Sequence, residues 1–417
     1  MKIHFDKSQE KQYIKIPFDV PSGMERVDIS GTYAKENGTV IDLAVLAPCG
    51  LLLGAAGGAR SHVWISAIGS CAGFETLDPP QGTWFVLAGV YQLPEEGATV
   101  EYKITLTPKQ RRLFKGDTHL HTVASDGTSD VNGLIALAQE QNLDFIFITD
   151  HNNTAQNYQT GQYPRLTVIS GVEWTHFNGH ALFLGAQKAL TQSFGAEDWQ
   201  AGAALVQKAK NEGAFTVIAH PLCHVVPWEW GFDAEKISAF HGIEVWNGVM
   251  SERNERATYF WHGLLCNGAK IPVTGGSDYH RPGLLGSVAM PCMCVYAPSR
   301  SPADIVTAMQ NGNSFISYLP DGPEVDIFEY NESVLGATVD HDTPLDFVFA
   351  NLQAGDEIRL ITDRGTEKII CESGGMVTLK AEYAQCKFVR AEVYRSYAQG
   401  LPPMKALLSN PVYFNPA

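Results

Sequence analysis

Between residues 116 and 318, segments typical of β-strands alternate with segments typical of α-helices, and this alternation restricts the fold more than any other feature of the sequence. The run LDFIFITDH, residues 143–151, is almost continuously apolar, as in buried parallel strands, and follows a helical pattern at residues 132–142. Further strand and helix patterns follow as far as a helical segment at residues 301–312. Repeated strand–helix units predict an α/β fold, a parallel sheet covered by helices and either open or closed into a barrel.

The flanking regions have a different pattern. Residues 1–113 contain short apolar or alternating runs at sandwich-like spacing, and the glycine-rich segment GLLLGAAGGARS, residues 50–61, is expected to be a loop. The end of the chain returns to strand-like segments such as LDFVFANL and KFVRAEVYR. With 417 residues the chain is long enough for several cores. We therefore expect a β-sandwich-like domain at 1–113, an α/β domain at 114–320 and a β-rich domain at 321–417.

Charge and composition exclude several classes of protein. The net charge of -15 argues against nucleic acid or an anionic membrane as the main partner, since both favour clustered Lys and Arg. No segment reaches the roughly 18 apolar residues of a membrane span, and the first twenty residues do not resemble a signal peptide. The eight cysteines are scattered without a Cys-x-x-Cys pair, which predicts free, mostly buried thiols. These features together predict a cytoplasmic protein.

Nearly every expected strand of the α/β region ends in a side chain that can bind a metal ion. In GDTHLHTVASDG, residues 116–127, two histidines lie two positions apart on an extended segment, so they project to the same face. The carboxyl ends of strands are also where α/β folds build their active sites. Ten of the 13 histidines lie between residues 119 and 280. The candidate metal ligands are His119, His121, Asp126, His151, Glu173, His180, His220, Asp278 and His280.

The types of ligand indicate the chemistry. Imidazole and carboxylate groups together suit zinc, manganese or iron better than calcium, which prefers oxygen alone. The set exceeds the three or four protein ligands of a single catalytic ion, so it implies two or three divalent ions that share carboxylates. Such a cluster brings the pKa of a bridging water towards neutrality and stabilises both attacking and leaving oxygens. The implied reaction is hydrolysis, and no dinucleotide-binding or P-loop motif is present.

The motifs THLHTVASDG, FITDHN, GVEW, AHP and GGSDYH, in this order and spacing, resemble those of the PHP (polymerase and histidinol phosphatase) superfamily. Within it they are most similar to the carbaryl-hydrolase-like metallohydrolases, which the C-terminal FVRAEVYR and SNPVYF also resemble. The motif resemblance covers about residues 116–318. It implies a distorted (β/α)7 TIM-like barrel, flanked by β-rich regions, with a two- or three-metal centre at its C-terminal mouth.

The resemblance also implies that the ligands divide among the ions. The three implied groups are His119, His121, Glu173 and Asp278; Asp126 and His151, with Glu173 or a water as the bridge; and His180, His220 and His280.

Other side chains near these motifs are candidates for catalysis or substrate contact. Asp278 or a histidine such as His220 is expected to transfer the proton, and Arg281 to clamp a phosphate or carboxylate, although a plain surface position is the competing interpretation. Asp150 either orients an imidazole or caps the following turn. The candidate substrate contacts are Arg281, Trp246, Asn247, His176 and His224, with core packing as the alternative for Trp246 and solvation as the alternative for the two histidines.

These expectations combine into a metal-dependent hydrolase in which a metal-bound hydroxide attacks phosphorus or an acyl carbon. We favour a phosphoesterase acting on a small anionic phosphate ester, because that chemistry is the commonest in the superfamily. A carbamate, aryl-ester or amide hydrolase is the first alternative. A non-catalytic binding scaffold with a structural metal cluster is the second. The acidic charge balance disfavours a proofreading nuclease.

Overall fold

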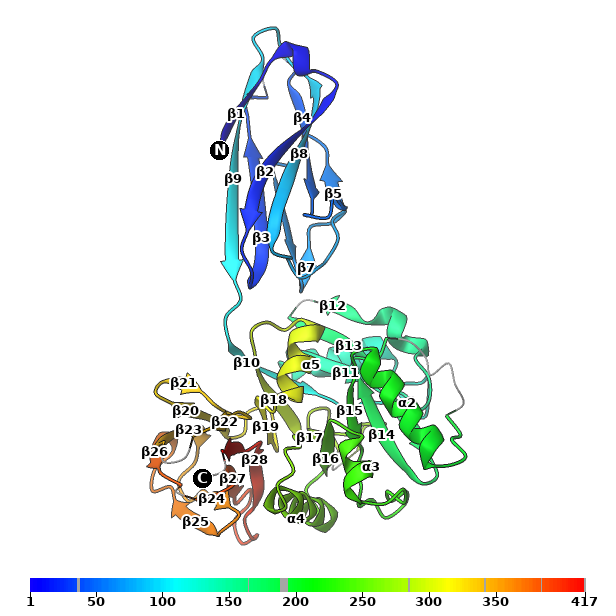
Figure 1. The fold of residues 1–417 in the computed structure, drawn as a ribbon, viewed down its shortest axis with the longest axis vertical. Helices are drawn as coiled ribbons and strands as arrows, with labels where there is room; N and C mark the ends of the chain where they lie inside the picture. Colours follow the sequence, from blue (N-terminus) through cyan, green and yellow to red (C-terminus); the bar gives the residue numbers. More distant parts are fainter. Residues whose placement is uncertain are drawn as a thin grey trace. The chain divides into compact units, whose positions relative to one another are not determined.

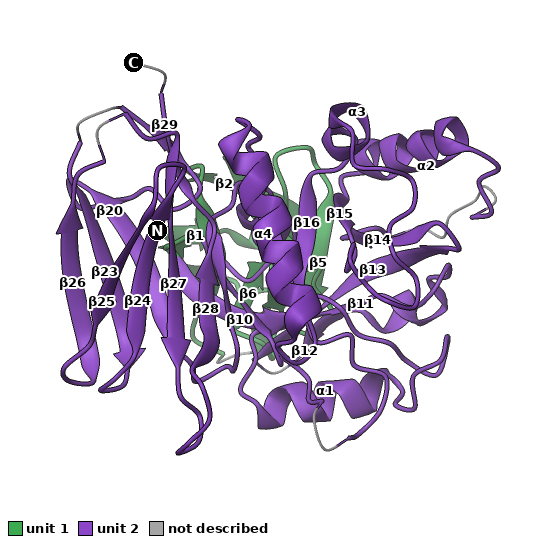
Figure 2. Cartoon of the chain, turned by 90° about the horizontal axis from the view of Figure 1, so that it is seen from below, with its two compact units in different colours: residues 1–111 green, residues 112–417 purple. Residues whose placement is uncertain are grey.

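The computed structural model describes residues 1–35, 38–163, 165–187, 194–283, 286–340, 343–383 and 385–415. Over these residues the chain is a mixed α/β structure dominated by strands. It divides into two compact units, residues 1–111 and residues 112–417 (Figure 2).

Residues 1–111 form two antiparallel sheets with a core of their own (Figure 1). One sheet has the order β1–β9–β3–β6–β7 and the other the order β2–β8–β4–β5. Apolar side chains at alternate strand positions, among them Val27, Ile29, Trp84 and Val86, are buried in this core. The strands are β1 (Lys2–Phe5), β2 (Gln12–Val20), β3 (Met24–Thr32), β4 (Val40–Leu46), β5 (Leu52–Ala56), β6 (His62–Ser66), β7 (Gly69–Ser70), β8 (Gly82–Gln92) and β9 (Ala98–Pro108).

The prediction of a loop at residues 50–61 is wrong, because β5 lies within it and pairs with β4. At one position of this strand, glycine is required for a steric reason. A Cβ atom added to Gly54 would lie 2.5 Å from the carbonyl oxygen of Gly73, so only glycine permits this close approach.

Residues 112–417 contain one long mixed sheet and a smaller sheet of order β21–β20–β23–β26. The long sheet has the order β17–β16–β15–β14–β13–β11–β10–β18–β19–β28–β27–β24–β25, with β12, β22 and β29 paired to it at the side. Its first half is formed by β10 (Arg112–Asp117), β11 (Phe145–Ile148), β12 (Gly161–Tyr163), β13 (Leu166–His176), β14 (Gly179–Leu184), β15 (Phe215–Ile218), β16 (Gly242–Asn247), β17 (Val273–Gly276), β18 (Cys292–Ala297) and β19 (Ser314–Ser317).

The expectation of a parallel sheet holds for only part of this series. The pairs β10–β11, β11–β13, β15–β16 and β16–β17 are parallel, whereas β14 is antiparallel to both β13 and β15. Only Phe177 and Asn178 separate β13 from β14. A connection this short permits a hairpin but not the crossover of a dozen or more residues that a parallel pair needs.

The chain segments that follow β10 and β17 meet. Leu120 and Tyr279 form an isolated parallel bridge, and the backbone N–H of His121 donates to the carbonyl of Tyr279 at 3.1 Å. Over the described residues this contact is a single bridge rather than a continuous ladder between β10 and β17. It nevertheless brings the first and last strand ends of the predicted motifs together.

Five α-helices are described in this unit: α1 (Val131–Glu140), α2 (Trp199–Asn211), α3 (Ala234–Ser238), α4 (Glu252–Cys266) and α5 (Pro302–Gln310). Their starts follow from local sequence, because the side chains of Asp130, Asp198 and Ser301 accept hydrogen bonds from the first turns of α1, α2 and α5. Helix α4 packs against β16 (Figure 2).

The C-terminal strands continue the long sheet, because β19 pairs with β28. The division of this unit into domains at 114–320 and 321–417 therefore stays a prediction. The remaining strands are β20 (Glu324–Glu329), β21 (Glu332–Ser333), β22 (Thr338–Val339), β23 (Leu345–Leu352), β24 (Glu357–Thr362), β25 (Thr366–Ile370), β26 (Gly375–Ala381), β27 (Phe388–Arg395), β28 (Met404–Ser409) and β29 (Val412–Phe414).

All eight cysteines are free thiols, and four of them are buried. Across the described ranges, no helix combines the length and apolar character that a membrane span requires.

Candidate metal centre

The predicted ligands from distant strand ends converge on the carboxylate of Glu173, which β13 carries into the interior. Its Oε1 atom lies 2.9 Å from Nδ1 of His180 and 3.1 Å from Nε2 of His220. Its Oε2 atom lies 3.4 Å from Nε2 of His119 and 3.4 Å from Nε2 of His121. The two oxygens thus face different groups of imidazoles, which is the arrangement of a bridging carboxylate.

Asp278, which follows β17, adds a second carboxylate to the same cluster. Its Oδ1 atom lies 3.1 Å from Nε2 of His121 and 3.4 Å from Nε2 of His119. His119, His220 and Asp278 each offer a ligand atom within 4.8 Å of the others. The strand ends of β10, β15 and β17 therefore contribute to one site.

Asp126 lies at the outer side of the cluster. Its Oδ1 atom is 3.2 Å from Nε2 of His280 and 3.4 Å from Nε2 of His151, and His121 completes this group. His280 is thus grouped with Asp126 and His151, whereas the resemblance implied that it would join His180 and His220.

Several buried ligand atoms have no hydrogen-bond partner among the described residues, and they fit divalent cations. They are Nε2 of His119, Nε2 of His121, Oε2 of Glu173 and Nδ1 of His220. Two atoms that bind one ion at about 2.1 Å lie about 3.0–3.4 Å apart in octahedral or tetrahedral geometry. The separations of 3.1–3.4 Å between Nε2 of His119 or His121 and the carboxylates of Glu173 and Asp278 match that spacing.

The backbone around the cluster is held in uncommon conformations. His220 and Asp278 have φ angles of 27° and 53°, in the region that non-glycine residues seldom adopt. Two glycines are required by close approach: a Cβ on Gly276 would lie 2.5 Å from the Cβ of His119, and one on Gly127 would lie 2.3 Å from the carbonyl oxygen of His121. These contacts account for Gly127 in the motif SDG and for the second glycine, Gly276, in GGSD.

The electrostatics of the cluster favour ionised carboxylates. Burial disfavours the anionic forms of Glu173 and Asp278, but the imidazoles, His119 foremost, hold the pKa of both carboxyls well below the ordinary range. Burial also opposes charge on His220, yet its contact with Glu173 raises the pKa of that imidazole to about 9. The site therefore needs positive charge, which divalent cations supply when they replace protons on the imidazoles.

Glu244, in the middle of β16, belongs to the site although the sequence analysis did not select it. Its Oε1 atom accepts from Nδ1 of His119 at 3.0 Å. Its Oε2 atom accepts from the backbone N–H of His220 at 3.0 Å and from Nδ2 of Asn247 at 3.1 Å. The available signal was a carboxylate within the otherwise apolar strand GIEVWN, because a fully buried acid must have partners.

Two further acids fix the loops that carry the ligands. Buried Asp117 accepts from the backbone N–H groups of His119, Ser277 and Ala289 at 3.2, 3.0 and 2.7 Å. Asp150 accepts from the Thr122 N–H and the Ser125 hydroxyl, both at 2.7 Å, and the same hydroxyl lies 3.4 Å from Nδ1 of His121. Among the described residues, Asp150 therefore reaches an imidazole through Ser125.

The predicted substrate contacts lie in different surroundings. Asn247 is inside the site, where its Nδ2 donates to Oδ2 of Asp278 at 3.2 Å and its Oδ1 accepts from Arg253 at 2.9 Å. Trp246 is 1% exposed and stacks on Tyr318, an environment that favours packing. Of the other candidate substrate contacts, His176 is buried, and both of its ring nitrogens are hydrogen-bonded to backbone groups. His224 and Arg281 are exposed.

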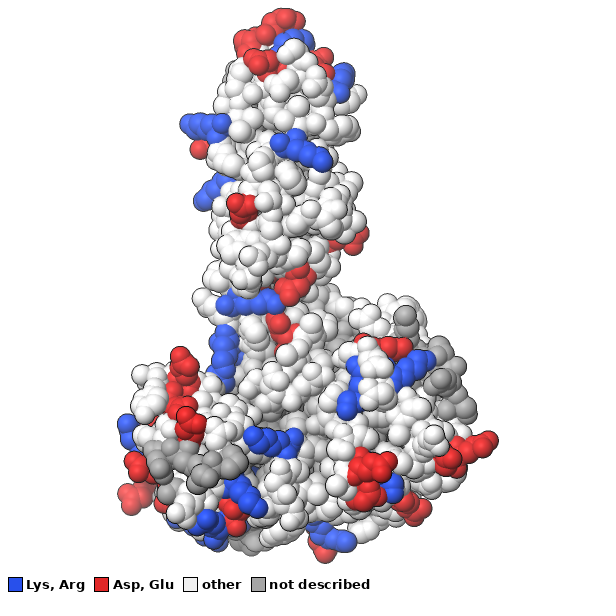
Figure 3. Space-filling view, viewed as in Figure 1, with Lys and Arg blue, Asp and Glu red and all other residues white. Residues whose placement is uncertain are grey.

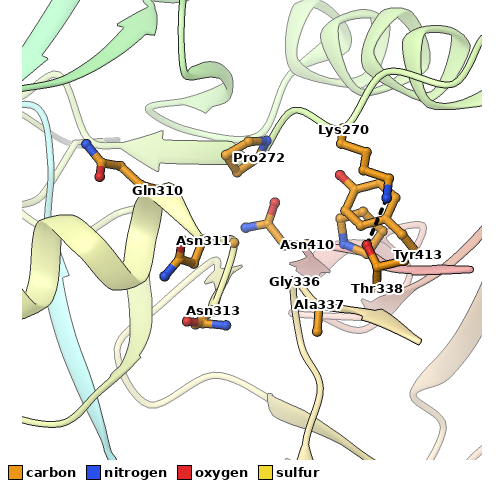
Figure 4. A pocket seen from close by; sticks show the side chains of 12 residues that line it. Lys270, Pro272, Gln310, Asn311, Asn313, Gly336, Ala337, Thr338, Asn410 and Tyr413 are labelled. Carbon is orange, nitrogen blue, oxygen red and sulfur yellow. Dashed lines mark hydrogen bonds between the residues drawn. The ribbon is translucent and has the colours of Figure 1, made fainter. Parts of the chain in front are cut away.

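A separate cavity of about 450 Å³ lies at the other end of β17 (Figure 4). Pro272, immediately before this strand, lines it, whereas Asp278 follows the strand. Its lining includes Lys270, Asn311 and Tyr413 but none of the candidate ligands. The cavity is therefore distinct from the metal centre.

On the face drawn in Figure 3, Lys and Arg side chains are interspersed with Asp and Glu rather than gathered into one continuous basic patch among the described residues.

No protein-family model matches this chain, and no curated protein matches it. Among solved structures, it is similar to a two-domain protein of Bacteroides vulgatus that contains a predicted PHP-like metal-dependent phosphoesterase. The two sequences are 18% identical, the TM-score is 0.43, and the match covers 72% of this chain and 96% of that one. A Bifidobacterium adolescentis protein, provisionally described as a metal-dependent phosphoesterase, has 17% identity, a TM-score of 0.30 and coverage of 42% and 90%. An amidohydrolase from Chromobacterium violaceum has 14% identity, a TM-score of 0.28 and coverage of 41% and 89%. At these values the similarities leave the function to be inferred from the site.

Proposed function

We propose that this protein is a metal-dependent hydrolase of the PHP superfamily that cleaves a small phosphate ester. Two or three divalent ions, zinc, manganese or iron, would be held by the nine predicted ligands. The observation that carries the proposal is the convergence of imidazoles from separate strand ends on the two oxygens of Glu173. Side-chain ligands of this number and type suit a shared-carboxylate cluster rather than a single ion.

Divalent ions in such a cluster supply Lewis acidity that activates water near neutral pH and neutralises charge on the departing oxygen. The protein's own groups divide the remaining tasks. Glu173, only 1% exposed, would bridge, while Asp278, whose side chain is 26% exposed, is the candidate to take a proton from water. Asn247 orients Asp278 by donating to its second oxygen.

A phosphate ester is favoured over a carbon ester because a multinuclear site offers more positive charge than a neutral carbonyl needs. Exposed Arg281, one residue from His280, is available to contact a phosphoryl oxygen. The proposal also includes a distorted (β/α)7 barrel, which the bridge between Leu120 and Tyr279 supports, the carbaryl-hydrolase-like branch and a cytoplasmic location.

The experiment combines metal analysis of the purified protein with a panel of nitrophenyl phosphates, phosphodiesters, esters and carbamates. Turnover of phosphates, lost in Asp278→Asn and retained in the exposed-residue control Glu212→Gln, is the expected result. Turnover of carbon esters alone would leave a hydrolase but refute the phosphoesterase. Bound metal without turnover of any substrate, and unfolding in Asp278→Asn, would favour the binding scaffold.

A further inference from the structure

A second cluster of charged side chains lies between helix α4 and the C-terminal strands. It surrounds a cavity of about 180 Å³ that contains none of the candidate metal ligands. The lining comes from α4, β24, β25, β27 and β28. The charged side chains among it are Arg359, Lys368, Arg390, Lys405, Glu255 and Glu392.

Four cationic side chains thus face three carboxylates: Glu255 and Glu392 in the lining, and Glu357, which pairs with Arg359 and Lys368. One positive charge remains in excess, in a chain whose net charge is -15. Two of the cations are buried: the side chains of Arg390 and Lys405 are 4% and 1% exposed. Buried charge is costly unless it is paired, so the excess favours an added anion.

Two residues that line the cavity also carry unpaired buried nitrogens. Arg390 donates through Nη1 to Glu392, but its Nε atom is buried and has no hydrogen-bond partner among the described residues. The same is true of Nδ1 of His262, which also lines the cavity. A guanidinium Nε–H is an obligatory donor, so a missing acceptor at this position is unusual.

The other cations are held in place around the cavity. Lys405 donates to Glu255 at 3.0 Å and to Thr258 at 3.2 Å, which joins β28 to α4. Arg359 stacks 3.6 Å above the ring of Tyr394. Lys368 is 56% exposed, so this part of the lining is in contact with solvent.

We propose that this cavity binds a small free oxyanion, phosphate or sulfate, with Arg390, Arg359 and Lys405 as its cationic contacts. A guanidinium group and an ammonium group together match the oxygens of a tetrahedral ion. The cavity is smaller than the 300–1,000 Å³ of typical drug-sized sites, which suits an inorganic ion with a few waters. This inference does not depend on the proposed hydrolase activity.

The direct test is a selenate soak of crystals of the purified protein, in which selenium marks the position of a tetrahedral dianion. We expect an anomalous peak inside the cavity, within hydrogen-bonding distance of the guanidinium group of Arg359 or Arg390. Ordered water alone in the cavity, or peaks only at other places, would overturn the proposal.

Solution binding provides the second test. Arg390 is a poor choice for substitution because its loss leaves Glu392 buried with one partner fewer. We therefore use Arg359→Gln, with Lys380→Gln as the control, since Lys380 is 78% exposed on β26 and does not line the cavity. In calorimetric titrations with sulfate at constant ionic strength, Arg359→Gln should bind about tenfold more weakly than wild type. Equal affinities in the two variants would contradict the proposed site.

Discussion

Glu244 holds two parts of the candidate metal centre at once, because its oxygens reach the ring of His119 and the backbone of His220. The contact to His119 fixes which ring nitrogen points at Glu173 and Asp278. Partners of this kind commonly change metal affinity by about 10–100-fold when they are removed.

We predict that Glu244→Gln lowers metal affinity by about 10–100-fold while the protein stays folded. The reason is that the amide NH2 group of the new side chain would face either the ring N–H of His119 or the backbone N–H of His220, and neither can accept a hydrogen bond from it. Metal titration monitored by a chelator competition measures the effect. Glu212→Gln, a change at an exposed position after α2, should leave affinity unchanged. Equal affinity in both variants would show that Glu244 does not act on the site.

Gly276 provides a steric test at the same scale. We predict that Gly276→Ala displaces His119, because the new Cβ would lie 2.5 Å from the Cβ of that residue. The substitution should lower the free energy of unfolding by about 1–3 kcal/mol and should also reduce the amount of bound metal. Chemical denaturation and metal content measure the two effects. Gly263→Ala is the control, since Gly263 lies within α4 with open space around it, and helix propensity predicts a small gain in stability there. A Gly276→Ala protein with full metal content would disprove the steric argument.

The candidate ligands could be selected from the sequence at the residue scale, and their hydrogen-bond partners could not. Side-chain type and position at the end of a strand are properties of the local sequence, which is why His119, Glu173 and Asp278 stood out. The contact of Glu244 with His119 joins residues 125 positions apart, and no local pattern encodes it. Asn247 illustrates the same limit, because it was selected as a candidate substrate contact and its hydrogen bond to Asp278 was not foreseen.

Among the elements, strand β27 carries a buried ion-pair network with β28. Burial opposes ionisation of Glu392, but Lys405 and Arg390 lower the pKa of its carboxyl to about 2. A lowered pKa in the folded state means that ionised Glu392 stabilises the fold above its ordinary pKa of 4.5, and that this contribution is lost as the pH falls towards 2.

We predict that Glu392→Gln destabilises the protein by about 3–5 kcal/mol at pH 7, because it leaves two buried cations with one anion fewer. The difference from wild type should shrink as the pH falls from 4.5 to 2, since the wild-type carboxyl is then progressively protonated. Urea denaturation at a series of pH values measures this difference. A difference that stays constant through that range would mean that Glu392 does not titrate with a lowered pKa.

Element type was predictable where the sequence is periodic, and direction was not. The apolar run at β11 and the helical pattern before it gave the expected strand and helix. The antiparallel direction of β14 follows from a two-residue connection, Phe177 and Asn178, which hydrophobic periodicity does not register. Strand β5 was not predicted because its glycines are unfavourable in strands, and its pairing with β4 cannot be read from the local sequence.

At the scale of the whole molecule, residues 1–111 have a core cluster drawn from residues of that unit, and all candidate ligands lie in residues 112–417. We predict that a fragment of residues 112–417 folds and binds the same number of metal ions per chain as the full protein. Circular dichroism and elemental analysis test this. A fragment that is unfolded, or folded without metal, would show that the first unit is needed for the site.

The boundary predicted at residue 113 rests on a change in composition and rhythm, from short alternating strands to strand–helix units. The organisation after residue 320 could not be derived in the same way. Pairing of β19 with β28 joins segments about 90 residues apart in one sheet, and such long-range pairing leaves no mark in local sequence.

The central claim is that several divalent ions lie around Glu173. Anomalous scattering from crystals of the purified protein, recorded at the absorption edges of zinc, iron and manganese, tests it most directly. The account predicts two or three peaks, each at about 2.0–2.2 Å from an oxygen or nitrogen of the nine ligands, with at least one beside each oxygen of Glu173. Crystals without any peak within bonding distance of Glu173, from protein prepared with these metals supplied, would contradict it.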